Sequence, residues 1–121
     1  MTKSISVDFD AQHSCLTVSD PSAELSSSDS IEWVLTNNAA AGAFLPMTAA
    51  QPGFQWLSLP PSGHFAAPTL QSQQMIVLND LFAGSGGPWD YRLTAQINGN
   101  VYETRVLSFG AGTGNPSIKN N

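Results

Sequence analysis

Apolar and polar residues alternate most regularly near the C-terminal end of the chain. One side of a period of two holds Trp89, Tyr91, Leu93, Ala95 and Ile97. Such alternation is typical of a β-strand with one buried face. Asn98-Gly99-Asn100 follows directly, and Asn and Gly accept the positive φ angles that two-residue hairpin loops require. The pattern therefore predicts a long C-terminal hairpin over about residues 89–109.

The register of this hairpin depends on which two residues form its loop. An Asn98-Gly99 loop sets Arg92 directly across from Arg105, where like charges repel each other. Centring the loop on Gly99-Asn100 keeps the same faces buried and puts Arg105 opposite Thr94. We favour the second register on this ground and keep the first as its alternative.

Shorter segments earlier in the chain also carry strand patterns. Period-two alternation predicts strands at Ser4–Phe9, Ser14–Val18 and Ile31–Thr36, with a further short strand possible around Ala23–Leu25. The unbroken apolar run within Gln74–Leu81 predicts a strand covered on both faces. Trp33 is expected to anchor the core. Between Ala39 and Ser72 the pattern dissolves into small and polar residues, and long segments of that kind usually carry function or disorder.

The whole chain, residues 1–121, reads as one domain. Hydrophobic residues make up 41% of it, which is enough for an ordinary core. Short strands separated by turn signals indicate an all-β fold, an antiparallel two-sheet sandwich of the cupredoxin-like or immunoglobulin-like kind. The glycines after Phe109 predict a flexible tail over about residues 110–121, in which Ile118 could tuck back against a sheet.

One family resemblance supports this fold. The run from Leu16 through Pro21 to Asp29-Ser30-Ile31-Glu32-Trp33 resembles the early part of cupredoxin-like sandwiches, in which a strand reads Val-x-Trp. The hairpin at residues 89–109 would then be the last strand pair. The resemblance implies a fold and not a function, because such motifs are common in β-sandwiches.

Copper chemistry does not follow from that resemblance. Blue-copper proteins bind the metal through Cys, His and a weak axial Met, and in cupredoxins most of these ligands lie near the last strands. Here Cys15 lies near the N-terminus, His64 is the last histidine, and Met75 is the last methionine. We therefore expect no copper and no other cofactor.

Low charge is the most unusual feature of the composition. Only 11% of the residues are charged, against about 25% in a typical soluble domain. The net charge is −5, and the basic residues are Lys3, Arg92, Arg105 and Lys119. Binding a phosphate backbone requires several basic residues on one face. Nucleic acid is therefore excluded as a partner, and anionic membrane surfaces are disfavoured for the same reason.

The sequence also limits the compartment in which the protein is expected. Cys15 is the single cysteine and cannot form an internal disulfide, so nothing points to an oxidising compartment. No apolar run of about 20 residues predicts membrane insertion, and no signal peptide is visible after Met1. We expect a cytoplasmic protein, with export by a route that uses no cleaved signal as the alternative.

Candidate catalytic and metal-binding patterns are weak. His13-x-Cys15 could offer two metal ligands with His64 as a third, but an exposed turn histidine beside a buried thiol is the simpler interpretation. The carboxylates of Asp8-x-Asp10 are more simply solvated turn residues than calcium ligands. No Gly-x-Ser-x-Gly nucleophile motif occurs. We expect no metal and no catalytic residue, and an enzyme of unknown type ranks third among the functions.

The irregular middle region holds the candidate binding residues. Aromatic and imidazole side chains stand there among prolines and small polar residues, at Phe44, Phe54, Trp56, His64 and Phe65. Loops that carry large aromatics on a rigid scaffold are frequent recognition surfaces. The competing interpretation carries equal weight, and in it these rings fill the core and close the ends of the sandwich.

Two functions follow from these features. The first is a non-catalytic interaction or structural module that binds a protein partner or a second copy of itself, because few charges guard its strand edges. The second is a small-molecule or carbohydrate-binding module, in which Trp56 or Trp89 stacks on a neutral ligand. A polar, weakly charged surface that bears aromatics suits either function.

Overall fold

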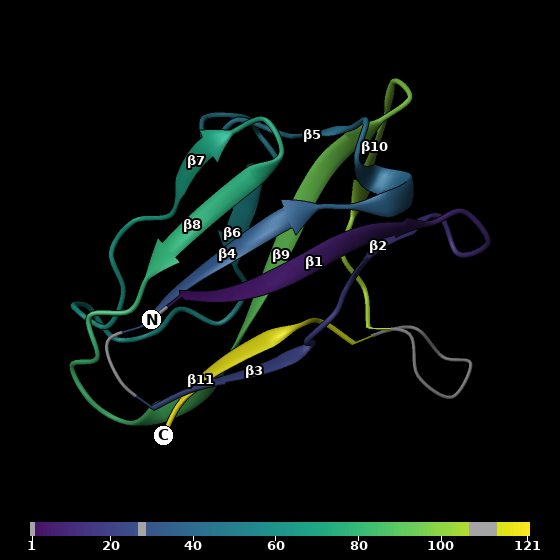
Figure 1. The fold of residues 1–121 in the computed structure, drawn as a ribbon. Coiled ribbons are helices and arrows are strands. Elements are labelled where there is room, and N and C mark those ends of the chain that lie inside the picture. Colours follow the sequence, from purple (N-terminus) through teal and green to yellow (C-terminus); the bar gives the residue numbers. More distant parts are fainter. Residues whose placement is uncertain (1, 27–28, 107–113) are drawn as a thin grey trace.

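The computed structural model describes residues 2–26, 29–106 and 114–121. Within these residues two β-sheets pack face to face, as Figure 1 shows. The predicted all-β sandwich is therefore confirmed. The described residues contain a single short helical element, the 3₁₀ turn η1 (Asn37–Ala39).

The first sheet has five strands in the order β2-β1-β4-β8-β7. Their bounds are β1 (Thr2–Asp10), β2 (Cys15–Val18), β4 (Ser30–Leu35), β7 (Thr69–Ser72) and β8 (Met75–Asn79). The three strands predicted from alternation in the first 36 residues all form. In β8 the burial alternates instead, since Ile76 and Leu78 are buried while Met75 and Val77 are half-exposed. The prediction that β8 is buried on both faces is therefore wrong, because one face of this strand is partly exposed to solvent.

The second sheet is organised around one long strand. Its path is β10 (Asn100–Glu103), β9 (Gly86–Ile97), β11 (Ser117–Asn120) and β3 (Ser22–Leu25), and the short strands β5 (Ala43–Phe44) and β6 (Phe54–Trp56) also pair with β9. The strand β9 contains the alternating segment, and its inward residues Trp89, Tyr91, Leu93, Ala95 and Ile97 are all buried. The strongest sequence pattern therefore marks the central strand of this sheet.

Both sheets are mixed, which differs from the purely antiparallel sandwich expected. The strand β1 pairs in parallel with β4, and β3 pairs in parallel with β11. Parallel pairing joins segments that are distant along the chain, and no local turn signal marks it. The two-layer architecture was thus predictable from alternation, whereas the direction of these two pairs was not.

An aromatic cluster fills the space between the sheets. Trp33 of β4 and Tyr91 of β9 are fully buried, and their ring centroids lie 5.1 Å apart. The Trp33 indole N–H donates a hydrogen bond of 3.0 Å to the Tyr91 hydroxyl. Phe54 of β6 stacks on Tyr91 at 5.4 Å. Trp33 is therefore the core anchor that the sequence predicts, and its polar atom has a partner inside the core.

The hairpin register favoured from the sequence is wrong. Asn100 pairs with Ile97, so the loop is Asn98-Gly99, and both loop residues have positive φ, 52° and 83°. The charge argument failed because regular pairing ends at Glu103. Arg105 leaves the hairpin, and its backbone N–H donates to the Leu16 oxygen of β2 at 3.0 Å. The two arginines therefore never face each other, and Arg92 makes an ion pair with Glu103 at 3.4 Å.

The second half of the hairpin is also shorter than the expected range of residues 89–109. The strand β10 ends at Glu103, and Thr104 forms an isolated parallel bridge with Leu16. This bridge connects the second sheet to the edge strand β2 of the first sheet. Residues 107–109 lie outside the described part of the chain, as do residues 110–113 of the expected tail.

The end of the chain is a strand and not the flexible tail expected from its glycines. Ser117–Asn120 form β11, which lies between β9 and β3. Ile118 is fully buried and Asn120 is 1% exposed. For this segment the prediction of a tail is wrong, because pairing with two strands outweighs the weak local propensity of four residues. The tucking of Ile118 against a sheet is confirmed.

Substitution of Ile118 tests the structural importance of β11. We expect Ile118→Ala to lower the free energy of unfolding by about 2 to 4 kcal/mol, because it leaves a cavity between β9 and β3. Urea unfolding followed by tryptophan fluorescence measures the change. Lys119→Ala, at the exposed neighbouring position, is the control and should change stability by about 0.5 kcal/mol or less. Equal, negligible effects of both substitutions would contradict the buried strand.

Tyr91→Phe tests the buried hydrogen bond between the sheets. We expect a loss of about 1 to 3 kcal/mol at pH 8, because the buried Trp33 N–H is left without an acceptor. Tyr102→Phe is the matched control, since no hydrogen bond of the Tyr102 hydroxyl is found among the described residues.

The difference in stability between wild type and Tyr91→Phe should depend on pH. Burial raises the pKa of Tyr91 well above its ordinary value of 10.0. The folded protein therefore holds this proton to a higher pH than the unfolded chain does, and the associated stability is lost as the pH rises above about 10. The stability gap between wild type and Tyr91→Phe should shrink between pH 8 and pH 11. A gap that stays constant or widens would contradict the buried phenol.

Candidate functional site

The structure divides the five candidate binding residues into two groups. Phe44 and Phe54 are each 3% exposed and lie in the core. The pairing of Phe54 with Leu93 of β9 turns its ring inward between the sheets. These two residues match the competing interpretation, in which the aromatics of this region fill the sandwich. Trp56, His64 and Phe65 are half-exposed and form the second group.

The second group extends the aromatic core to the surface. Trp56 packs edge-on against Phe54 at 5.0 Å, and Phe65 lies 5.1 Å from Trp56. Trp89 then contacts both Phe65, at 5.7 Å, and the imidazole of His64, at 5.6 Å. The outer rings therefore rest on a buried base of other rings, which fixes their orientation without any flexible side chain in between.

Apart from Trp56, the last residue of β6, the exposed part of this cluster lies on one loop, residues 57–65, which we call the apolar loop. It starts directly after β6, where the Leu57 and Ser58 N–H groups both donate to the Asp90 oxygen of β9, at 2.8 and 3.1 Å. It ends beside β8, where the Leu81 N–H donates to the His64 oxygen at 2.9 Å. Both ends are thus hydrogen-bonded to the sandwich, and the residues between them are exposed except for Pro60.

The apolar loop encloses a surface hollow of about 290 Å³. Its lining combines two aromatic rings, two prolines, a leucine and two small residues: Trp56, Leu59, Pro60, Pro61, Ser62, Gly63 and Phe65. None of these lining residues is charged. Pro60 is buried at the base, whereas Leu59 at the rim is 82% exposed. The structure thus places a large apolar side chain in water next to an apolar depression.

Exposed large hydrophobic side chains concentrate around this loop. In the described part of the chain there are four: Leu57, Leu59, Leu81 and Val101. The first two belong to the apolar loop, and Leu81 is hydrogen-bonded to it through its backbone. Single exposed leucines are ordinary on protein surfaces, but several on one loop and on the segment bonded to it are typical of interaction sites.

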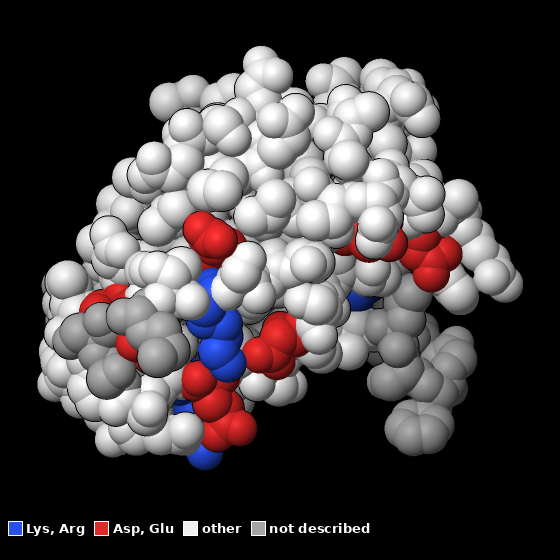
Figure 2. All heavy atoms as spheres, viewed as in Figure 1, with Lys and Arg blue, Asp and Glu red and all other residues white. Residues whose placement is uncertain are grey.

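The segment that builds this region is uncharged. From Trp33 to Asn79 the sequence contains no Asp, Glu, Lys or Arg. In Figure 2, which has the orientation of Figure 1, the upper part of the visible face over β5, β7 and β8 is white, and the coloured charges gather below it. The hollow itself is lined by uncharged residues only, in agreement with the depletion of charge at the centres of interfaces.

A second hollow, of about 310 Å³, has the opposite chemistry. It is lined by Ser14, Gln51, Val101, Tyr102, Glu103 and Arg105, near the hairpin end of the sandwich. The hydroxyl, amide and guanidinium groups in this lining can hydrogen-bond a polar ligand. Sequence analysis did not bring these residues together, because Ser14 and Gln51 meet the hairpin only through the fold.

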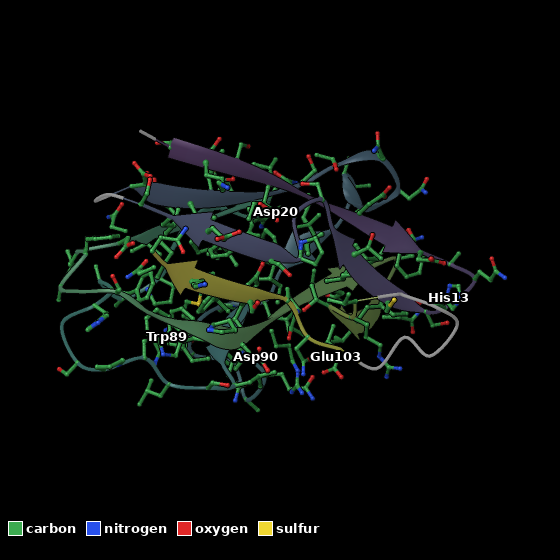
Figure 3. All side chains as sticks on the ribbon, turned by 90° about the horizontal axis from the view of Figure 1, so that it is seen from below. His13, Asp20, Trp89, Asp90 and Glu103 are labelled. Carbon is green, nitrogen blue, oxygen red and sulfur yellow. The ribbon has the colours of Figure 1, made fainter. Side chains whose placement is uncertain are left out.

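The residues considered for metal binding or nucleophilic catalysis lie apart. The His13 Nδ1–H donates to the Asp10 carboxylate oxygen Oδ2 across 3.0 Å, and this hydrogen bond lowers the pKa of Asp10. Burial raises the pKa of the Cys15 thiol, which disfavours the reactive thiolate. In Figure 3, His13 lies at the opposite end of the molecule from Trp89, the ring against which His64 packs. Among residues 2–26, 29–106 and 114–121 no metal-binding cluster of His, Cys, Asp or Glu is found.

A buried polar pair lies between the ends of β8 and β11. Asp80 and Asn120 are 4% and 1% exposed. The Asn120 amide donates to Asp80 Oδ1 at 3.3 Å and to the Gly84 oxygen at 3.4 Å, and the Phe82 N–H donates to the same carboxylate oxygen at 2.8 Å. These bonds fasten the loop between β8 and β9 to the C-terminal strand. We assign the pair a structural role.

Comparisons with known proteins do not assign the chain to a protein family. The sequence matches no protein-family model and no curated protein. Across the described ranges, no helix has the length and apolar character needed to cross a bilayer. The fold and the site define the protein as a β-sandwich domain with an uncharged aromatic surface hollow.

Sequence reasoning missed the residues that give this hollow its shape. Leu59 and its neighbours Pro60 and Pro61 did not stand out, because an isolated leucine in a loop carries no periodicity. The signal that was present is the pair of prolines after a leucine. Prolines restrict the chain to extended conformations and keep a short segment from folding back onto itself.

Two substitutions separate the rim of the hollow from its base. We expect Leu59→Ser to change stability by about 0.5 kcal/mol or less, because the side chain is exposed. Trp56→Ala should cost about 1 to 3 kcal/mol, since it removes contacts with Phe54 and Phe65. Urea unfolding of both variants checks this. A large loss in Leu59→Ser would mean that this leucine packs inside the protein.

Proposed function

We propose that this protein is a non-catalytic interaction module that binds a protein partner through the apolar loop. The observation that carries the proposal is the exposed Leu59 at the rim of a hollow lined by Trp56 and Phe65. Burying a leucine of this exposure in an apolar contact contributes about 1.5 to 3 kcal/mol. The Leu59 side chain does not gain this free energy in water, but it would gain it against the apolar surface of a partner.

The rigidity of the site also supports protein recognition. Both ends of the apolar loop are hydrogen-bonded to the sandwich, and its rings rest on the buried cluster of Phe54, Tyr91 and Trp33. A preformed site loses little conformational entropy when it binds. Aromatic side chains at the centre of such a patch are the usual carriers of binding energy.

Uncharged, apolar peptide segments are the chemistry that this surface fits. The lining provides rings, prolines and a leucine, and its single polar side chain is Ser62. An extended peptide with apolar side chains can fill a hollow of this kind, as in the aromatic grooves that receive proline-rich segments. Charged peptides would have to give up their hydration without an opposite charge in return.

Filling the hollow with a larger side chain tests this function. A library of displayed random peptides is selected on the wild-type protein, and the affinity of the selected peptides is measured by fluorescence titration. We expect the selected peptides to be uncharged and apolar. Their affinity should fall at least about tenfold in Ser62→Trp, because the new ring occupies the hollow. A tenfold fall in affinity corresponds to about 1.4 kcal/mol of binding free energy.

Gln71→Trp supplies the matched control. It adds the same ring at an exposed position of β7 and should leave peptide affinity unchanged. The proposal fails if the selected peptides bind Ser62→Trp as well as they bind wild type. It also fails if no peptide is selected at all.

The polar hollow beside Tyr102 supports a second function, binding of a small neutral ligand such as a sugar. A ring and several hydrogen-bonding side chains meet there, namely Tyr102, Ser14, Gln51 and Arg105. The tryptophans expected to stack on a sugar are less suited, because Trp89 is only 9% exposed and Trp56 lies among apolar neighbours. Titration with mono- and disaccharides, compared between wild type and Tyr102→Ala, distinguishes this function from peptide binding.

A further inference from the structure

The apolar loop carries both a projection and a depression of apolar character. Leu59 is 82% exposed at the rim, and the hollow beside it is lined by Trp56 and Phe65. The projection and the depression belong to the same short loop. A surface that holds both is complementary to itself, which is the requirement for a symmetric contact between two identical chains.

We infer that the partner of the apolar loop is a second copy of this chain. In the dimer a two-fold axis passes beside Pro60, and Leu59 of each copy enters the hollow of the other copy. The inference rests on the proposed function, in which this loop binds protein, and names the partner. Each copy then buries the side chain that it exposes as a monomer.

The distribution of charge favours a second copy over a charged partner. The chain carries a net charge of −5, so two copies repel each other if their acidic residues come close. No Asp, Glu, Lys or Arg occurs between Trp33 and Asn79, and the apolar loop lies inside that segment. The lining of the hollow is uncharged, so a second copy brings no like charge into the hollow itself, although Asp90 adjoins the start of the loop. Repulsion between charges more than about 8 to 10 Å apart is largely screened at physiological salt.

The other exposed leucines extend the same contact. Leu57 precedes the hollow in the loop, and Leu81 is joined to His64 by a backbone hydrogen bond. Leu59 is the one of these leucines that lines the hollow, and the other two add exposed apolar surface on the loop and on the segment bonded to it. The loop is nevertheless small beside the roughly 1,200 to 2,000 Å² of a stable interface. The dimer is therefore expected to be weak and to exchange rapidly with the monomer.

Measurement of mass in solution tests the inference. Sedimentation equilibrium on wild type is expected to show a mean mass close to that of the monomer at about 10 µM, rising toward twice that mass near 1 mM, the range of a weak interface. Leu59→Ser should remain monomeric throughout while keeping the unfolding curve of wild type. Val101→Ser, which removes an exposed apolar side chain from β10, is the control and should dimerise like wild type.

Two further readouts identify the contact. In a sample that mixes isotope-labelled and unlabelled chains, intermolecular nuclear Overhauser effects should connect the Leu59 methyl groups with the Trp56 and Phe65 rings. Salt should strengthen the association or leave it unchanged, because the contact holds no ion pair. Intermolecular contacts at the edge strand β7 in place of the apolar loop would overturn the inference.

The results separate this inference from the proposed function. A wild-type protein that stays monomeric at 1 mM, but whose peptide binding is abolished by Ser62→Trp, refutes the self-contact and retains protein recognition. Dimerisation that Leu59→Ser does not weaken also refutes it. A monomer with no peptide binding refutes both. Dimerisation that requires Leu59 and is lost in Ser62→Trp, together with peptide binding that Ser62→Trp abolishes, supports both.

Discussion

The pairing of β9 is the constraint on which the rest of the structure depends. This one strand pairs with β10, β11, β5 and β6, so almost every residue of the second sheet takes its position from it. Its inward face supplies Tyr91, whose hydroxyl accepts the hydrogen bond from Trp33 of the opposite sheet. Sheet pairing and the packing of the two layers are therefore joined in one strand. The 12-residue length of β9 is what allows it to reach four partners.

The separation in sequence between interacting residues decided which parts of the fold could be predicted. Alternation over ten residues is a local signal, and it correctly predicted the strand β9 and a turn within residues 98–100. The favoured loop, Gly99-Asn100, was wrong by one residue, because the loop is Asn98-Gly99. Local reasoning failed where a distant partner decided the outcome. Arg105 was assumed to continue the hairpin, yet its N–H bonds to Leu16, which is remote in sequence. The same holds for Ser117–Asn120, whose weak local signal gave no indication that two strands, β9 and β3, enclose it.

The candidate site was partly visible in the sequence for the same physical reason. Aromatic residues in an irregular segment are easily noticed, but sheet pairing decides which of them reach the surface. Phe54 pairs with Leu93 deep in the layer, whereas Trp56, two residues on, lies where the pairing ends and is left half-exposed. Leu59 lies just beyond that pairing. The exposure of Leu59 results from the end of β6 and from Pro60 and Pro61. A hydrophobic period of two or of 3.6 residues reveals neither feature.

The rings that stabilise the core also form the surface proposed for recognition. The contacts run without a break from Trp33 through Phe54 to Trp56 and Phe65, so the base of the hollow is an extension of the core. A hollow built in this way is rigid, and a substitution at Trp56 that altered the proposed binding would also cost folding stability. Leu59 is free of that coupling because it touches water and not the core. Specificity can therefore vary at the rim of the hollow while the fold is maintained at its base.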